Sequence, residues 1–257
     1  MNRIDKLFSE KKKNILSVYF TAGHPTLNST VEIIQELEKS GVDMIEIGIP
    51  FSDPLADGPV IQQSSQVALK NGMSLKLLFE QLKDIREKVN IPLLLMGYLN
   101  PVYQYGIEKF VKKAAEIGID GTILPDLPVQ EYLEEYKPIF SKYNFYNIFF
   151  IAPETEDERM KILDSNSQGF IYMVSSSSTT GIKSDIKEDQ EAYFNRVKEL
   201  NLRNPKVVGF GISNKDSFTK VCQYVEGAII GSAFVRQLDQ GKNNLKETIS
   251  GFISSIL

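Results

Sequence analysis

The sequence predicts a single α/β domain of the (β/α)8 TIM-barrel class with an additional N-terminal helix. Short apolar segments rich in β-branched residues alternate with longer segments of helical period over 257 residues. Eight strands, each followed by a helix, fit this length, which is typical of such barrels. No linker or composition break divides the chain. We therefore expect residues 1–257 to form one catalytic domain.

Taken in order, the predicted strands are short, mostly apolar runs that precede polar or glycine-containing loops. They cover residues 15–20, 42–49, 92–96, 121–124, 146–151, 169–174, 206–210 and 227–230. The intervening segments repeat apolar residues at helical spacing and are predicted as helices over 30–39, 75–89, 107–117, 129–143, 156–166, 187–200, 215–221 and 245–257. An amphipathic segment over 2–12 would cover the bottom of the barrel.

Composition excludes several classes of function. A formal net charge of −4 argues against a surface for nucleic acid. No apolar run approaches the roughly 18 residues of a membrane-spanning helix, and no signal-peptide pattern opens the sequence. A single cysteine, Cys222, excludes an internal disulfide and fits a reducing compartment, so we expect a cytoplasmic protein. With His24 as its one histidine, the chain is poorly supplied for a multi-histidine metal site, and we expect no metal.

The segment 46–59 (EIGIPFSDPLADGP) carries the strongest functional signal. Along the predicted strand 42–49 the isoleucines fall on odd positions, so Glu46 points to the opposite face. In a barrel both faces of the sheet are buried, and a buried carboxylate is costly unless a site pairs or solvates it. Prolines at 50, 54 and 59 stiffen the loop that carries Asp57. We therefore predict Glu46 and Asp57 as catalytic residues.

Simpler explanations exist for each of these residues. Glu46 could be a salt-bridged barrel residue, although strands two and three offer no obvious basic partner. Asp57 with Gly58 could form only a turn, which we would prefer if Glu46 were not nearby. Asp53 is interpreted as structural or partner-facing. His24 is interpreted as a loop residue at the rim of the site, without a catalytic role.

Glycine and hydroxyl residues follow three consecutive strands, at 175–181, 209–213 and 231–233. Backbone N–H groups at the start of a helix bind phosphate well where no Cβ blocks the approach. Barrels place such a site after strands seven and eight. The sequence therefore predicts that the substrate carries a phosphate group.

Taken together, these motifs resemble the alpha subunit of tryptophan synthase, and the similarity runs over essentially the whole chain. It is carried by residues 20–23 (FTAG), 46–59, 98–103 (YLNPVY), 125–128 (PDLP), 172–181 (YMVSSSSTTG), 209–213 (GFGIS) and 231–233 (GSA). The resemblance implies cleavage of indole-3-glycerol phosphate to indole and glyceraldehyde 3-phosphate in L-tryptophan biosynthesis. It also implies an α2β2 assembly in which indole passes to a beta subunit. PLP is expected only in that beta subunit, and no cofactor in this chain.

The resemblance also implies roles for individual residues. Glu46 and Asp57 take the two catalytic positions, and Tyr172 and Phe20 take supporting substrate-binding positions, although Tyr172 is equally well explained by packing. The phosphate-binding backbone positions are those of Gly181, Gly211, Gly231 and Ser232. The loop before Gly181 reads SSTT where family members commonly carry a Gly-Val-Thr run, so its hinge behaviour is not expected to transfer.

The residues also suit the chemistry on their own. A retro-aldol cleavage needs a proton on indole C3, removal of a hydroxyl proton and stabilisation of positive charge on the indole. Glu46 could supply general acid–base catalysis if its surroundings raise its pKa. Asp57, on a solvated loop, should stay ionised and accept a hydrogen bond from the indole N–H.

Two alternatives remain. One is another phosphate-binding barrel, such as a sugar-phosphate isomerase, epimerase or aldolase. The predicted strands offer one lysine, Lys206, at the start of its strand and away from the loops that would carry the site, and no acidic metal set is apparent. The other is a catalytically weak subunit that completes a partner.

Overall fold

The strands of the computed structural model, which describes residues 1–174, 188–209 and 211–257, lie close to the predicted positions. They are β1 (Ile15–Thr21), β2 (Met44–Gly48), β3 (Leu93–Met96), β4 (Gly121–Ile123), β5 (Tyr146–Ile148), β6 (Phe150–Ile151), β7 (Ile171–Val174), β8 (Lys206–Gly209) and β9 (Gly227–Ile230). All pairings between them are parallel, as expected for strands that alternate with helices.

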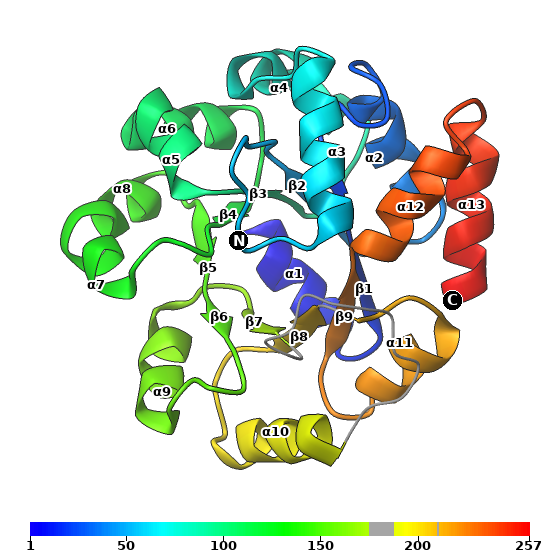
Figure 1. The fold of residues 1–257 in the computed structure, drawn as a ribbon. Helices are drawn as coiled ribbons and strands as arrows, with labels where there is room; N and C mark the ends of the chain where they lie inside the picture. The colour runs from blue at the N-terminus through cyan, green and yellow to red at the C-terminus, as the bar shows by residue number, and fades with distance from the viewer. Residues whose placement is uncertain (175–187, 210) are drawn as a thin grey trace.

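The sheet closes through one bent strand. Its order is β5-β4-β3-β2-β1-β9-β8-β7-β6, and the two end strands are separated in the chain only by Phe149. β5 pairs with β4 and β6 pairs with β7, while the Phe149 N–H donates to the Ser167 hydroxyl at 3.1 Å. The predicted strand 146–151 is therefore one barrel strand in two pieces. The (β/α)8 prediction is confirmed (Figure 1).

Helices surround this sheet (Figure 1). They are α1 (Arg3–Glu10), α2 (Thr30–Lys39), α3 (Pro59–Lys70), α4 (Leu75–Gln81), η1 (Ile85–Glu87), α5 (Leu99–Tyr105), α6 (Ile107–Glu116), α7 (Val129–Glu131), η2 (Tyr132–Tyr136), α8 (Lys137–Lys142), α9 (Asp157–Asn166), α10 (Glu188–Glu199), α11 (Lys215–Val221), α12 (Ser232–Gln240) and α13 (Leu245–Ile256).

Three of these helices, α3, α5 and α12, were not predicted from the sequence. Each begins immediately after a strand or a functional loop, where glycines, prolines and hydroxyl residues hide the helical period. The predicted helix 129–143 is divided by the π-helical turn η2. Pro138 follows that turn and has no N–H to donate to a preceding carbonyl, so a regular α-helix cannot run through it.

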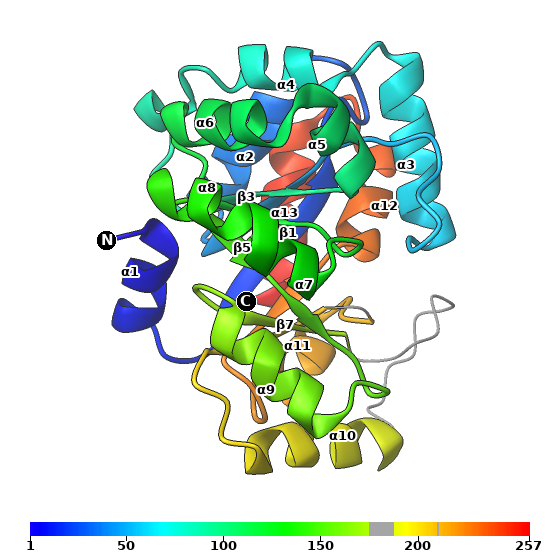
Figure 2. The same ribbon diagram turned by 90° about the vertical axis from the view of Figure 1, so that its left-hand side faces the viewer.

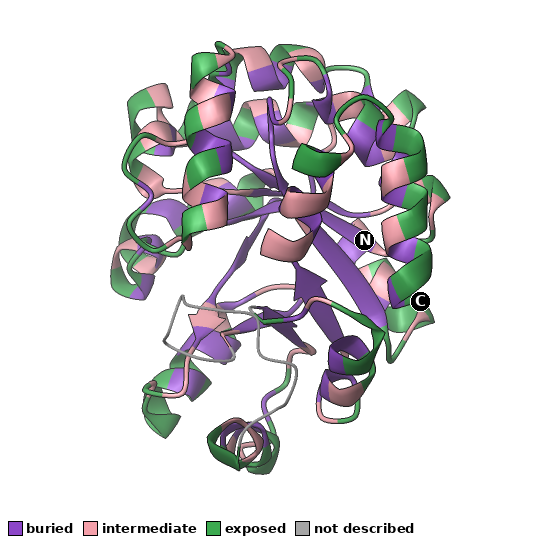
Figure 3. Ribbon diagram, turned by 45° about the vertical axis from the view of Figure 1, so that its right-hand side comes forward, coloured by how far each residue is buried: buried purple, intermediate pink, exposed green. Residues whose placement is uncertain are grey.

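The strand side chains alternate between two cores. Leu16, Val18 and Phe20 of β1 belong to the outer core, which packs the sheet against the helices. Ile15 of β1 and Met44 of β2 instead belong to the inner core, which fills the barrel. Figure 3 shows the strands mostly buried, whereas the outer faces of the surrounding helices are largely exposed.

α1 covers the amino-terminal end of the barrel, as predicted for segment 2–12. Its Ile4 and Phe8 complete the inner core, and the Asn2 side chain donates to the Asp120 carbonyl at 2.9 Å. Figure 2 places α1 on the left of the molecule and α3 on the right, so the opposite end stays clear of this helix. Within the described ranges, no helix is both long enough and apolar enough to cross a membrane.

Candidate active site

Glu46 lies inside the barrel, in the direction that the period of β2 predicts. Met44 of the same strand belongs to the inner core, and Glu46, two residues on, has no exposed surface. The Ser17 hydroxyl donates to Oε1 at 2.9 Å, and Oε2 has no hydrogen-bond partner among the described residues. Burial raises the pKa of Glu46 from 4.5 to about 8, and the Ser17 hydrogen bond opposes this rise. At neutral pH the side chain is therefore mostly protonated and able to give a proton.

Asp57 lies in the loop between β2 and α3 and is half-buried. Its Oδ2 accepts a hydrogen bond from the Tyr98 hydroxyl at 3.1 Å, and the same hydroxyl accepts from the Ala56 N–H at 3.0 Å. Burial raises the pKa of Asp57 from 3.8 to about 6, opposed by the hydrogen bond from Tyr98. The loop of Asp57 is therefore less solvated than the sequence suggested. Asp57 remains mostly ionised at pH 7, as its expected role requires.

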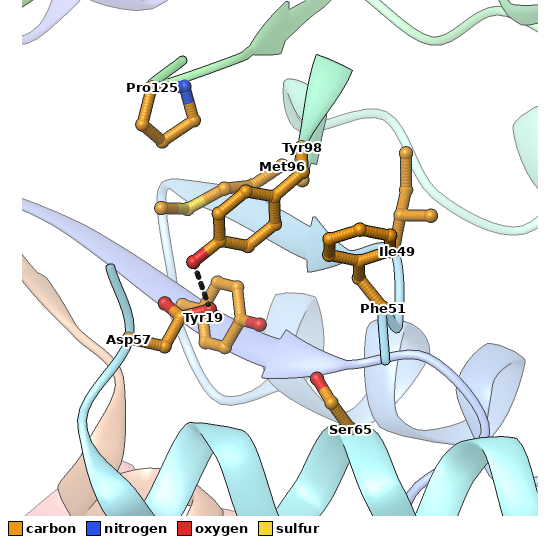
Figure 4. Close-up of a pocket in the computed structure, with 9 residues that line it drawn as sticks. Tyr19, Ile49, Phe51, Asp57, Ser65, Met96, Tyr98 and Pro125 are labelled. Atoms are coloured by element: carbon orange, nitrogen blue, oxygen red, sulfur yellow. Dashed lines mark hydrogen bonds between the residues drawn. The ribbon is translucent and has the colours of Figure 1, made fainter. Parts of the chain in front are cut away.

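Asp57 borders a pocket at the carboxyl ends of β1, β2 and β3 (Figure 4). The pocket is lined by Tyr19, Ile49, Phe51, Asp57, Ser65, Met96, Gly97, Tyr98 and Pro125. The Tyr98 ring stacks on Phe51 at a centroid distance of 5.2 Å, which fixes the phenol next to Asp57. Apolar and aromatic walls with one anionic group suit a flat, cationic heteroaromatic ring.

The structure does not bring Phe20 to this pocket. Phe20 belongs to the outer core, and its neighbour Tyr19 points inward instead, because side chains alternate along β1. Tyr19 pairs with Glu46 across β1 and β2, and a Cβ at Gly48 would overlap its phenol oxygen. Gly48 lies two residues beyond Glu46 on the same face of β2, so the Tyr19 phenol lies over the next inward position of this strand. Glu46 is not among the residues that line the pocket.

Tyr172 of β7 reaches the same region from the far side of the barrel. Its ring belongs to the inner core and stacks on Phe150 at 4.3 Å. Burial raises its pKa well above the usual value, and the charges of Glu46 and Asp57 raise it further. The side chain therefore packs the barrel, and its neutral hydroxyl lies against Gly209 of β8, within the influence of both carboxylate charges. Packing and a role in the site do not exclude one another here.

Three of the four predicted phosphate-binding residues lie at the carboxyl ends of neighbouring strands. Gly231 is the N-cap of α12 and Ser232 is its first residue, directly after β9. Gly211 follows β8, which pairs with β9, and adopts a positive φ of 80°. The first turn of α12 thus presents unpaired backbone N–H groups beside Tyr19. Gly181 lies within residues 175–187, outside the described residues.

His24 is not the rim residue that the sequence predicts. Its side chain is only 1% exposed, and Nε2 lies 2.8 Å from an Asp239 carboxylate oxygen. Asp239 belongs to α12, a helix that was not predicted from the sequence. His24 therefore joins the loop after β1 to the helix whose N-terminus carries Gly231. The Asp126 carboxylate holds the loop after β4 against the start of α5, because it accepts the Leu99 N–H at 2.8 Å.

Comparison with known proteins shows one consistent similarity. A sequence profile of the tryptophan synthase alpha chain matches residues 6–255. The tryptophan synthase alpha chain of Flavobacterium johnsoniae is 60% identical over 97% of this chain and 98% of that protein. That of Bacteroides thetaiotaomicron is 56% identical over 95% of each chain.

Solved structures agree with the sequence comparisons. Tryptophan synthase subunit alpha from Legionella pneumophila superposes with a TM-score of 0.90 at 34% identity, over 100% of this chain and 97% of that one. A chain of the tryptophan synthase complex from Pyrococcus furiosus superposes with a TM-score of 0.87, also at 34% identity, over 96% of this chain and 98% of that one.

Proposed function

Because the chain belongs to the tryptophan synthase alpha chain family, and therefore cleaves indole-3-glycerol phosphate to indole and glyceraldehyde 3-phosphate, we propose that Glu46 and Asp57 carry out this cleavage. The observation that carries the proposal is the contrast between the two carboxyl groups. Burial raises the pKa of Glu46 to about 8, whereas the half-buried Asp57 reaches only about 6. One group is thus protonated and the other ionised at neutral pH.

Glu46 moves the proton that the reaction transfers. It donates a proton to C3 of the indole, which turns the ring into an indolenine cation. The bond between C3 and the glycerol chain then breaks, and its electron pair returns to the ring. The adjacent hydroxyl loses its proton and becomes the aldehyde of glyceraldehyde 3-phosphate, while Glu46 regains a proton. The net change is one proton moved from the hydroxyl oxygen to C3.

Asp57 stabilises the cation that forms between these proton transfers. Its carboxylate accepts a hydrogen bond from the indole N–H, which becomes more acidic when the ring is protonated. The bond is therefore stronger in the transition state than in the ground state. Tyr98 holds Asp57 in place through its hydroxyl. In this proposal Tyr19, rather than Phe20, is the contact from β1, and Tyr172 supports the ring from the opposite side.

The phosphate group is bound by backbone N–H groups at Gly211, Gly231 and Ser232, together with Gly181. We further propose that residues 1–257 act as one catalytic domain in the cytoplasm and assemble with a beta subunit as α2β2. PLP then belongs to that partner and not to this chain. Support comes from the similarity to a chain of the tryptophan synthase complex of Pyrococcus furiosus.

The proposal is tested by indole release from indole-3-glycerol phosphate, with and without the beta subunit. Wild-type chain should release indole slowly alone and faster with the partner. Asp57→Asn should lower kcat by at least about 10²-fold with KM little changed, because it removes an interaction needed chiefly in the transition state. If Asp57→Asn raised KM at unchanged kcat, Asp57 would only position the substrate. If wild-type chain released no indole in either condition, the chain would be a binding subunit.

A further inference from the structure

The two carboxylate oxygens of Glu46 have different surroundings. Oε1 accepts the hydrogen bond from the Ser17 hydroxyl at 2.9 Å, whereas Oε2 has no partner among the described residues. Ser17 and Glu46 are both 0% exposed. Ser17 pairs with Met44 in the register of β1 and β2, so it lies diagonally across from Glu46 on the inner face. The sheet itself therefore fixes this contact.

We infer that Ser17 is a positioning residue for the cleavage, because its hydroxyl holds Oε1 of Glu46 and leaves Oε2 as the oxygen that exchanges the proton with the substrate. The inference rests on the proposed function of Glu46. A protonated carboxyl group has one carbonyl oxygen and one hydroxyl. Since the Ser17 hydroxyl donates, it selects Oε1 as the carbonyl oxygen, and the proton resides on Oε2.

The same bond assists the transfer. After Glu46 gives up its proton, the negative charge remains in a buried position with no cationic partner in the described part of the chain. A hydrogen bond to an ionised group is about twice as strong as one between neutral groups. The Ser17 bond therefore favours the carboxylate that follows proton donation more than the carboxyl group that precedes it.

The titration of Glu46 can be distinguished from that of the other titratable groups near it. Tyr19 of β1 and Tyr172 of β7 have pKa values raised well above the usual range by burial, so both stay neutral below pH 9. Asp57, in the loop after β2, has its pKa raised to about 6 and titrates at lower pH. The residue paired with Glu46 on β3 is Leu94, which does not titrate. A change near pH 8 in the kcat/KM profile therefore belongs to Glu46.

The test compares Ser17→Ala with wild type and with Ser167→Ala. Ser167 is a matched control, since it is equally buried and its hydroxyl bonds to backbone groups, the Phe149 N–H and the Phe170 carbonyl, rather than to Glu46. Loss of a hydrogen bond to an ionised group should move the upper limb of the kcat/KM profile to higher pH by about one unit. At pH 7 we expect kcat to fall about fivefold while KM stays within about twofold.

A direct readout is the 13C NMR titration of Cδ in glutamate-labelled protein, with Glu46→Gln identifying the Glu46 resonance. Ser17→Ala should raise this titration midpoint, and Ser167→Ala should leave it unchanged. An unmoved midpoint in folded Ser17→Ala, or an equal movement in Ser167→Ala, would overturn the inference. If the proposed role of Glu46 were wrong, Glu46→Gln would retain cleavage activity. That outcome is distinct from an unmoved titration midpoint in Ser17→Ala.

Discussion

Glu46 should make the folded chain less stable at neutral pH, and Glu46→Gln should remove this cost. The pKa of Glu46 is raised from 4.5 in the unfolded chain to about 8 in the folded chain. Between these values the unfolded chain has released the proton and the folded chain retains it, so stability falls as pH rises from about 4.5 to about 8. Below 4.5 both states are protonated and no cost remains.

The magnitude follows from the same two values. At pH 7 the unfolded carboxyl lies about 2.5 pH units above its midpoint, and each unit corresponds to about 1.36 kcal/mol, giving a cost of about 3 kcal/mol. Glutamine resembles the protonated carboxyl group in shape, and its carbonyl oxygen can still accept from Ser17. Glu46→Gln should therefore be more stable than wild type by about 3 kcal/mol at pH 7 and nearly equal to it at pH 4.

The assay is equilibrium urea unfolding of both proteins at pH 4, 5.5, 7 and 8.5, with Glu80→Gln as a control at an exposed position. The free-energy difference between Glu46→Gln and wild type should grow across this range, and the control should show no such trend. A constant difference over all four pH values would contradict this prediction. It would mean that the buried Glu46 is not held protonated by the fold.

Three further outcomes follow from the geometry of the site. Gly48→Ala places a Cβ against the Tyr19 oxygen, so the free energy of unfolding should fall by about 1–3 kcal/mol in urea titrations, and an unchanged value would contradict the placement of Tyr19. Tyr98→Phe removes the hydrogen bond that lowers the pKa of Asp57, so the acidic limb of the kcat/KM profile should move to higher pH. An unmoved limb would contradict the assignment of this limb to Asp57. Gly231→Val crowds the start of α12 and should weaken the affinity for glycerol phosphate, measured by calorimetry, at least about tenfold with little loss of stability. Unchanged affinity would argue against phosphate binding at this helix.

The barrel and the direction of Glu46 were predictable because both depend on short-range periodicity. Alternation along β2 is enough to send Glu46 to the inner face, and the helical period of segment 2–12 is enough to place apolar side chains of α1 beneath the barrel. The bend at Phe149 was not predictable, since it depends on the Ser167 hydroxyl, which replaces a strand partner for the Phe149 N–H.

The exact residues of the site were harder to predict. Choosing Phe20 instead of Tyr19 is an error of one position, and in a strand one position reverses the face. His24 was assigned to the rim because α12, whose Asp239 contacts its side chain, was not predicted. The pKa of Asp57 depends on how tightly its loop packs against Tyr98, which lies 41 residues away in the chain. Such distant contacts leave no periodic pattern in the sequence.

The most direct test of the account is a single-turnover measurement of indole release by wild-type chain and Glu46→Gln, each saturated with indole-3-glycerol phosphate at pH 7 and bound to the beta subunit. Single-turnover conditions separate the cleavage step from product release, and calorimetry with glycerol phosphate checks that the phosphate site is intact. We predict a loss of at least about 10²-fold in the cleavage rate at near-normal affinity for glycerol phosphate. A Glu46→Gln variant that cleaves at most of the wild-type rate would contradict the assignment of proton transfer to Glu46.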